Sequence, residues 1–312
     1  MRRRRATRAW AAIVGVVLAS GSLAACSTAG ADATASTGGT RTIEVVAAEN
    51  FWGSIAAQLG GRHVHVTDII TSPDADPHDY EPTAQDGRAI ASSDLVLVNG
   101  IGYDTWASKL AAASPSTHRI DLTVGTVLGV PAGGNPHRWY NPDDVRRVIT
   151  ALVSDFARLD PTDQGYFAEQ EHAFETTALA PYDSVISAIR TRYAGTPVGA
   201  SESIFAMLAP ALGLDLRTPP GFLEAISEGT DPTAADKRTI DRQIEQRAIK
   251  VYVYNSQNAT PDVQGQITAA RMHGIPVTTI TETLTPANES WQQWQTTQLQ
   301  RLRAALAQAT GR

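Results

Sequence analysis

The segment HVHVTDIITSPDADPHDYEPTAQDGRAIASS, residues 63–93, places one histidine between a predicted strand and a predicted helix. Residues 63–70 are strand-like and residues 84–93 are helix-like, and the turn between them contains Pro77 and Pro82. His78 lies on this turn. Loops held by a rigid scaffold often carry binding residues, so His78 is well placed to meet a ligand.

Strand-like and helix-like runs alternate along most of the chain. The strand-like runs are residues 43–48, 64–70, 95–99, 119–122, 197–201, 250–255 and 276–280. This alternation favours parallel sheets with helices on both faces. We therefore predict an α/β fold of two lobes with mainly parallel sheets. Because ligands of open α/β sheets bind at the carboxyl ends of strands, the ligand is expected in the cleft between the lobes.

The middle of the chain has a different pattern. Asn141-Pro142-Asp143-Asp144 is a helix-start signal, with a polar cap, a proline and acidic residues, and Asp160-Pro161-Thr162-Asp163 repeats it. A helix of about 30 residues from there would span roughly 45 Å, more than a small lobe requires. We favour a long rigid helix joining the lobes, with two packed surface helices as the alternative. The expected boundaries are 42–158, 159–194 and 195–312.

The N-terminus indicates export. Arg2 to Arg5 form a charged region, residues 9–19 an apolar region, and Leu23-Ala24-Ala25-Cys26 a small-residue cleavage site, so residues 1–25 read as a signal peptide. The apolar run is shorter than the roughly 20 residues of a membrane span. Cys26 is the only cysteine and occupies a lipobox position, so we expect a lipid anchor there; the alternative is an ordinary signal peptide.

Residues 26–41 are rich in Ser, Thr, Ala and Gly and read as a flexible tether from the membrane. The expected location is the extracytoplasmic face of the cell membrane. The net charge of −6 argues against a nucleic-acid partner, which requires a basic face. With Cys26 lipidated, no thiol remains for a disulfide or a cysteine-based metal site.

A second proline-bracketed histidine, His137, follows Asn135-Pro136. Two imidazoles in similar settings suggest one shared transition metal. Glu202 and Glu282 each follow a predicted strand, so they have the same strand-end location as the histidines. Two imidazoles and two carboxylates form a ligand set suited to Mn²⁺, Fe²⁺ or Zn²⁺.

Simpler roles remain open for all four residues. Glu202 could be a charge at a helix N-terminus, Glu282 a solvated loop charge, and the two histidines hydrogen-bonded structural residues. The remaining histidines occur in ordinary contexts and are left out of the site: His63, His65, His118, His172 and His273.

The proline-bracketed segments and Asn99-Gly100-Ile101-Gly102-Tyr103-Asp104-Thr105-Trp106 resemble signature segments of the zinc/manganese solute-binding lipoproteins of bacterial ABC importers. This is the cluster A-I group (solute-binding protein family 9), which includes zinc-uptake proteins and manganese-binding streptococcal adhesins. Residues 226–233 resemble a further shared segment. The resemblance covers the chain from about Thr42 to its end and implies one metal between two lobes, with His78, His137, Glu202 and Glu282 as ligands.

Three departures from the family pattern bear on the metal. Zinc-specific members usually have histidine where this chain has Glu202, so the glutamate resembles the manganese branch. The fourth ligand is usually aspartate rather than Glu282. The histidine-rich loop of zinc-uptake members is absent, since residues 101–135 contain only His118. Carboxylates suit Mn²⁺, whereas almost any such site binds Zn²⁺ more tightly in solution, so both metals stay open.

The expected function is capture of Mn²⁺ or Zn²⁺ by a monomeric, membrane-anchored protein and delivery to an ABC permease, without enzymatic turnover. One rival is a surface adhesin or structural lipoprotein that the metal only stabilises. Another is a secreted metallohydrolase, which would need an open coordination position and a poised base. No His-Glu-x-x-His motif is present in the sequence.

Overall fold

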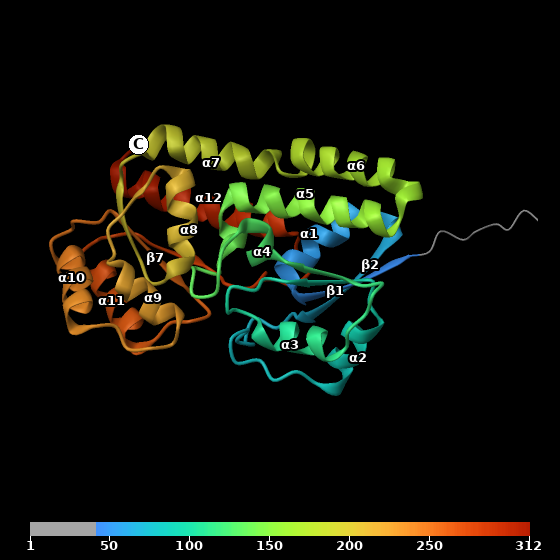
Figure 1. The fold of residues 1–312 in the computed structure, drawn as a ribbon. Coiled ribbons are helices and arrows are strands. Elements are labelled where there is room, and N and C mark those ends of the chain that lie inside the picture. Colours follow the sequence, from blue (N-terminus) through green and yellow to red (C-terminus); the bar gives the residue numbers. More distant parts are fainter. Residues whose placement is uncertain (1–41) are drawn as a thin grey trace, which may run out of the picture. The chain divides into compact units, whose positions relative to one another are not determined.

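The computed structural model describes residues 42–312, which contain two separate four-stranded sheets (Figure 1). These described residues belong to one compact unit. The predicted signal peptide, the lipidation site Cys26 and the tether lie outside the described residues.

The first sheet has the strand order β2-β1-β3-β4, and every pairing is parallel. Its strands are β1 (Ile43–Glu49), β2 (Val64–Ile70), β3 (Leu95–Val98) and β4 (Ile120–Thr123). β3 is buried along its whole length, as expected for a parallel strand covered on both faces. The order reverses between β1 and β3, which is where open α/β sheets place their ligands.

The second sheet repeats this topology with the order β6-β5-β7-β8, again wholly parallel. Its strands are β5 (Pro197–Ala200), β6 (Asp215–Leu216), β7 (Val251–Asn255) and β8 (Val277–Ile280). The corresponding switch point lies between β5 and β7. The prediction of two parallel α/β sheets is confirmed.

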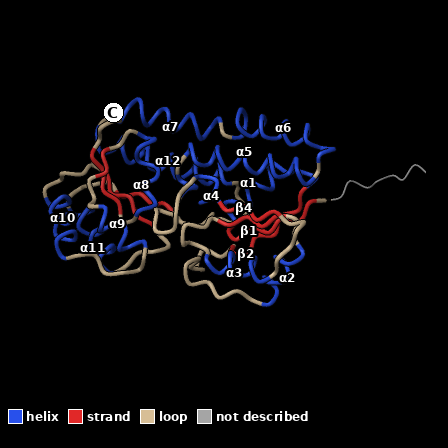
Figure 2. The backbone as a smooth tube through the Cα atoms, in the orientation of Figure 1, coloured by secondary structure: helices blue, strands red, loops and turns tan. Residues whose placement is uncertain are grey.

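Helices surround both sheets (Figure 2). In the first half of the chain they are α1 (Asn50–Gly60), α2 (Ala84–Ser92), α3 (Thr105–Ala113), α4 (Val124–Leu128) and α5 (Pro142–Leu159), with short 3₁₀ turns η1 (Gly61–His63), η2 (Arg138–Tyr140) and η3 (Pro161–Asp163). Later come α6 (Gln164–Ala173), α7 (Ala180–Tyr193), α8 (Ser203–Leu212), α9 (Pro220–Ser227), α10 (Ala234–Glu245), α11 (Pro261–Met272) and α12 (Trp291–Thr310).

The segment predicted to be one long helix is a series of helical pieces. After η3, α6 leads through the π-helical turn η4 (Phe174–Ala178) into α7, with a bend at Leu179. In Figure 1, α6 and α7 follow one another along the same side of the described chain. A π-helical turn inserts an extra residue into the helical repeat and interrupts a regular helix.

Side-chain caps explain where two helices of the first half begin. Thr83 forms a reciprocal capping box with Asp86 at the start of α2. At the start of α5, the Asn141 side chain accepts hydrogen bonds from the backbone of Asp143 and Asp144. Such caps satisfy amide groups that have no partner inside the helix, and each contributes about 1 kcal/mol. The α2 cap lies directly after the His78 turn and therefore fixes one end of it.

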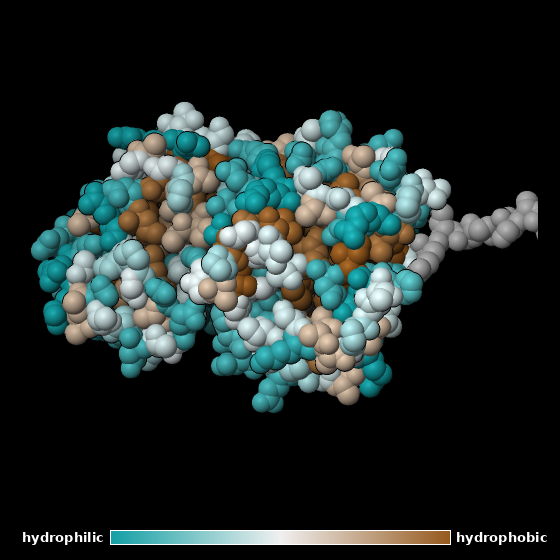
Figure 3. All heavy atoms as spheres, in the orientation of Figure 1, coloured by the Kyte–Doolittle hydropathy of each residue, from teal (hydrophilic) through white to brown (hydrophobic). Residues whose placement is uncertain are grey.

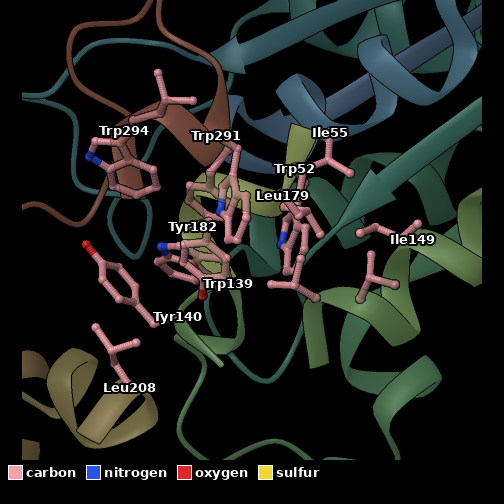
Figure 4. Close-up of a cluster of buried hydrophobic side chains, with 14 of the residues drawn as sticks. Trp52, Ile55, Trp139, Tyr140, Ile149, Leu179, Tyr182, Leu208, Trp291 and Trp294 are labelled. Atoms are coloured by element: carbon pink, nitrogen blue, oxygen red, sulfur yellow. The ribbon is translucent and has the colours of Figure 1, made fainter. Parts of the chain in front are cut away.

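One large hydrophobic core joins the two halves (Figure 4). Its aromatic members include Trp52 from α1, Trp139 from η2 and Trp291 from α12, all completely buried. The Phe51 and Trp139 rings stack with centroids 3.9 Å apart. Because this core contains residues of both sheets, a large hinge movement between them would expose aromatic surface and is therefore costly.

Most of the surface seen in Figure 3 is hydrophilic, and hydrophobic residues show mainly around α8 and beside α1 and α5. Among the described residues, Met272 is the one large hydrophobic side chain that is extensively exposed. None of the helices in residues 42–312 has the length and apolar character that a bilayer crossing requires.

Candidate metal-binding site

Three of the four predicted ligands lie in loops that follow strands; the strand-end location expected for His137 is wrong, because α4 and a loop separate it from β4. His78 follows β2 and His137 precedes η2 in the first half, while Glu202 follows β5 and Glu282 follows β8 in the second. His137 and Glu202 are buried, with 1% and 2% of their surface exposed. His78 and Glu282 are partly buried.

The local hydrogen bonds of His137 orient its ring. The side-chain oxygen of Asn135 accepts one hydrogen bond from the His137 backbone N–H (3.0 Å) and another from Nδ1–H (2.9 Å). Asn135 is itself fixed, because its amide nitrogen donates to the carbonyl of Ser203 at 2.8 Å. With the proton on Nδ1, the lone pair of Nε2 is available, the arrangement that metal-binding histidines use.

Nε2 of His137 faces the Oε1 atom of Glu282 at 3.6 Å. A neutral imidazole nitrogen and a carboxylate oxygen both carry lone pairs, so this approach is favourable only when a proton or a metal ion lies between them. Two atoms bound to one ion at about 2.1 Å are roughly 3–3.5 Å apart, close to the observed separation. The pair is therefore suited to hold a cation.

Glu282 is held by partners from both halves of the chain. The Tyr103 hydroxyl donates a hydrogen bond to Glu282 Oε1 at 2.9 Å. The backbone N–H of Glu282 donates to the side-chain oxygen of Gln257 at 2.6 Å. Its carbonyl accepts from the Trp139 indole at 3.1 Å. Burial favours a higher pKa for Glu282, but hydrogen bonding and charge from His137, together with Tyr103 and His78, lower the pKa overall. Glu282 is thus ionised and held by fixed partners, which argues against a solvated loop charge.

Glu202 lies close to Glu282 without a nearby positive charge. The Asn255 amide nitrogen is 3.2 Å from Glu202 Oε2 and 3.5 Å from Glu282 Oε2. The other oxygen of Glu202 is buried and makes no hydrogen bond. Burial, followed by the charge of Glu282, raises the pKa of Glu202 to about 8. Its side chain does not cap α8, which argues against the helix-charge alternative.

His78 reaches the same region through an aromatic contact. Its ring meets the Tyr103 ring edge to face, with centroids 4.8 Å apart, and Tyr103 lies 6.1 Å from the His137 ring. His78 and Glu282 also line a cavity of about 710 Å³ together with the loops at Asp74 and Ser227. The structure brings His137, Glu202 and Glu282 into direct or shared contact, and His78 joins them through Tyr103.

The four side chains do not form a closed cluster. Among residues 42–312, the one group of three or more potential ligands whose atoms all lie within 4.8 Å of one another is His63, Asp160 and Asp163, in another part of the fold. Loading the predicted site with an ion would therefore require His78 and the glutamates to draw together.

A tight loop after β3 positions Tyr103. The Asp104 side chain accepts hydrogen bonds from the backbone N–H groups of Asn99 (2.6 Å) and Gly100 (2.7 Å). Ile101 adopts a φ of 62°, a costly conformation for a β-branched residue that recurs at binding sites. Gly100 also has a positive φ, and a Cβ there would lie 2.6 Å from Thr123. The loop is thus held in a strained shape that presents Tyr103 to Glu282.

Buried carboxyl groups lie behind this loop. Glu49, at the end of β1, is completely buried, and burial followed by the charge of Asp104 raises its pKa well above the usual range. Burial also raises the pKa of Asp104 to about 6, although backbone hydrogen bonds from Gly100 and Asn99 oppose the rise. Glu49 therefore keeps its proton while Asp104 anchors the loop.

Several site residues were not singled out from the sequence. Tyr103 is part of a recognised segment and Asn255 ends a predicted strand, so a signal existed for both. Gln257 gave no comparable signal, whereas Asn135 also belongs to a recognised segment. Their partners are 25 and 68 residues away in the chain, distances that only the fold brings together.

Solved structures that share this fold include proteins titled as metal-binding. A periplasmic metal-binding protein from candidatus Liberibacter asiaticus superimposes with a TM-score of 0.70 at 17% identity, over 85% of this chain and 100% of that one. The crystal structure of ZnuA gives a TM-score of 0.67 at 17% identity, over 85% and 99%. At this identity the likeness establishes the fold.

The family follows from the sequence itself. Residues 45–305 match the family described as zinc-uptake complex component A, periplasmic, and the chain belongs to this family.

The names of similar proteins mention different metals. The manganese-binding lipoprotein MntA of Halalkalibacterium halodurans is 23% identical over 42% of this chain and 45% of its own length, and the iron-binding protein YfeA of Yersinia pestis is 32% identical over 34% and 36%. The chain thus spans less than half of these two relatives. The manganese ABC transporter substrate-binding lipoprotein PsaA of Streptococcus anginosus is 22% identical over 77% and 79%.

Proposed function

We propose that this protein is the extracytoplasmic solute-binding component of an ABC importer and that its cargo is a divalent transition metal, Mn²⁺ or Zn²⁺. Membership of the zinc-uptake family and the names of the relatives support the class. The observation that carries the proposal is the approach of His137 Nε2 to Glu282 Oε1 at 3.6 Å, with Glu202 beside Glu282 on the shared Asn255 amide. A divalent cation bound by these groups would take the place of the proton that Glu202 keeps in the metal-free protein.

In this proposal His78 and His137 bind the ion from the lobe of residues 42–158. Glu202 and Glu282 complete the shell from the lobe of residues 195–312, and residues 159–194 connect the two. Two carboxylates neutralise the ion's two charges, and neutral imidazoles suit Mn²⁺, Fe²⁺ and Zn²⁺ alike. Glu202 in place of a third imidazole favours Mn²⁺ as the physiological cargo.

The shared core favours release by local loop movement over a wide hinge opening. The loop that carries His78 contacts the opposite lobe through one hydrogen bond, from the Gln257 amide to the carbonyl of Pro73 at 3.0 Å. Docking of the permease would shift this loop, withdraw His78 and weaken the site. The protein acts as a monomer by binding and not by turnover.

Metal titration tests the proposed function. Purified, chelator-treated protein should bind Mn²⁺ and Zn²⁺ tightly, His78→Ala should weaken both, and the variant should keep its circular dichroism spectrum. The matched control is His118→Ala, an exposed histidine outside the site. A wild-type protein that binds neither ion, or a His78→Ala variant with unchanged affinity, would refute the assignment.

The proposed anchor needs its own test. The relatives MntA and PsaA are named as lipoproteins, and we extend this to Cys26 as the lipidated residue. Replacing Cys26 with Ala should move the protein from the membrane fraction to the soluble fraction of the host. Continued membrane association of that variant would contradict lipidation at this position.

A further inference from the structure

His63 lies apart from the proposed cargo site, in a small group of potential metal ligands. It ends the turn η1, just before β2, and not within the strand. Asp160 caps the turn η3 between α5 and α6, and Asp163 ends it. One ligand atom from each of the three residues lies within 4.8 Å of the other two.

The surroundings of His63 leave its ring nitrogens without aligned partners. The side chain is 3% exposed, and Nδ1 lies 3.0 Å from Asp163 Oδ2. That contact lacks hydrogen-bond geometry, and neither ring nitrogen of His63 makes a hydrogen bond. Buried polar atoms normally have hydrogen-bond partners. The unpaired ring nitrogens of His63 are therefore available to bind a metal ion.

The spacing matches a coordination sphere. Two atoms each about 2.1 Å from one ion are roughly 3–3.5 Å apart, and His63 Nδ1 and Asp163 Oδ2 are 3.0 Å apart, at the short end of that range. Asp160 is close enough to complete a three-residue set after a small side-chain movement. Two carboxylates would balance the charge of a divalent ion, and the partly exposed aspartates leave room for water ligands.

Aromatic packing fixes the turn that carries His63. The His63 ring contacts Tyr166 with centroids 4.5 Å apart and meets Phe167 edge to face at 5.8 Å. The Tyr166 hydroxyl accepts a hydrogen bond from the Arg62 backbone N–H at 3.4 Å. The imidazole is therefore held in place before any ion arrives, which lowers the entropy cost of binding.

We propose that His63, Asp160 and Asp163 form a second divalent-metal site, which takes a first-row ion such as Zn²⁺ and joins the start of β2 to the connection between α5 and α6. The mixed imidazole and carboxylate set suits Zn²⁺, whereas Ca²⁺ prefers sites made of oxygen ligands alone. The site is structural or regulatory and does not depend on the cargo site.

Zn²⁺ stoichiometry, measured by calorimetry on the full-length protein, tests this inference. Wild type should bind two ions per chain, and His63→Gln and Asp163→Asn should each bind one. The matched control His65→Gln alters a mostly exposed histidine two residues away that pairs with Glu44; it should still bind two. Ca²⁺ in excess should displace neither ion.

A cargo-site variant separates this inference from the proposed function. His137→Ala should retain one Zn²⁺ that raises the melting temperature, and the double variant with His63→Gln should bind none. A wild type with a single ion that His63→Gln does not remove would overturn the second site, even if that ion is lost in His137→Ala. A single ion that His63→Gln removes and His137→Ala leaves in place would overturn the cargo site alone.

Discussion

Replacing Glu202 with Gln should flatten the pH dependence of stability in the metal-free protein. Glu202 has its pKa raised from 4.5 to about 8 by burial and by the neighbouring charge of Glu282. Between these values the folded state holds a proton that the unfolded chain has released. The free energy of unfolding therefore falls as pH rises through this window, by about 1.4 kcal/mol per pH unit.

From pH 5 to pH 7.5 this amounts to a loss of about 3 kcal/mol from Glu202 alone. Urea denaturation with EDTA present, at both pH values, measures the loss in wild type and in Glu202→Gln. Asp68 and Asp104 also have raised pKa values, so both proteins should lose stability, and the difference between them isolates Glu202. The matched control is Glu228→Gln at the exposed cavity rim. Equal losses of unfolding free energy in wild type and Glu202→Gln would refute the claim that the pKa of Glu202 is raised by burial.

Three further predictions concern metal binding. His137→Ala should weaken Mn²⁺ binding by more than about 100-fold in calorimetry, beyond the 10–100-fold typical of residues that only support a ligand; a smaller loss would remove His137 from the ligand set. Tyr103→Phe removes the hydroxyl that orients Glu282 and should cost about 10-fold in affinity with the fold intact, so an unchanged dissociation constant would rule out that role. Free Mn²⁺ at 100 times the dissociation constant of the cargo site should stabilise the His63→Gln variant, which lacks the second site, by about 2.7 kcal/mol. Adding Glu202→Gln to that variant should remove the stabilisation; equal stabilisation of both in thermal denaturation would contradict the role of Glu202.

The fold was predictable because its signals are local. Buried apolar runs such as Leu95–Val98 and helix starts such as Asn141-Pro142 appear in the sequence as they appear in the structure. The break between α6 and α7 had one signal in the sequence, Pro181 in the first turn of α7, which the interior of an unbroken helix would not accommodate. The π-helical turn at Phe174–Ala178 arises where this helical run packs on the core, with Phe174 and Leu179 buried.

The site was predictable only in part. Strand-end positions indicated His78, His137, Glu202 and Glu282, and the structure gathers three of them closely. The residues that set their geometry depend on contacts across the chain: Tyr103 reaches Glu282 over 179 positions. His63 shows the same limit, because its partners Asp160 and Asp163 become neighbours only when α5 and α6 pack against α1.

Anomalous diffraction from crystals grown with Mn²⁺ tests the central claim most directly. We predict an anomalous peak at the manganese edge between His137 Nε2 and the carboxylates of Glu202 and Glu282, with His78 drawn in as the fourth ligand. A well-ordered structure in which Mn²⁺ is absent from this position, while His137 and Glu282 keep their present 3.6 Å contact, would contradict the account.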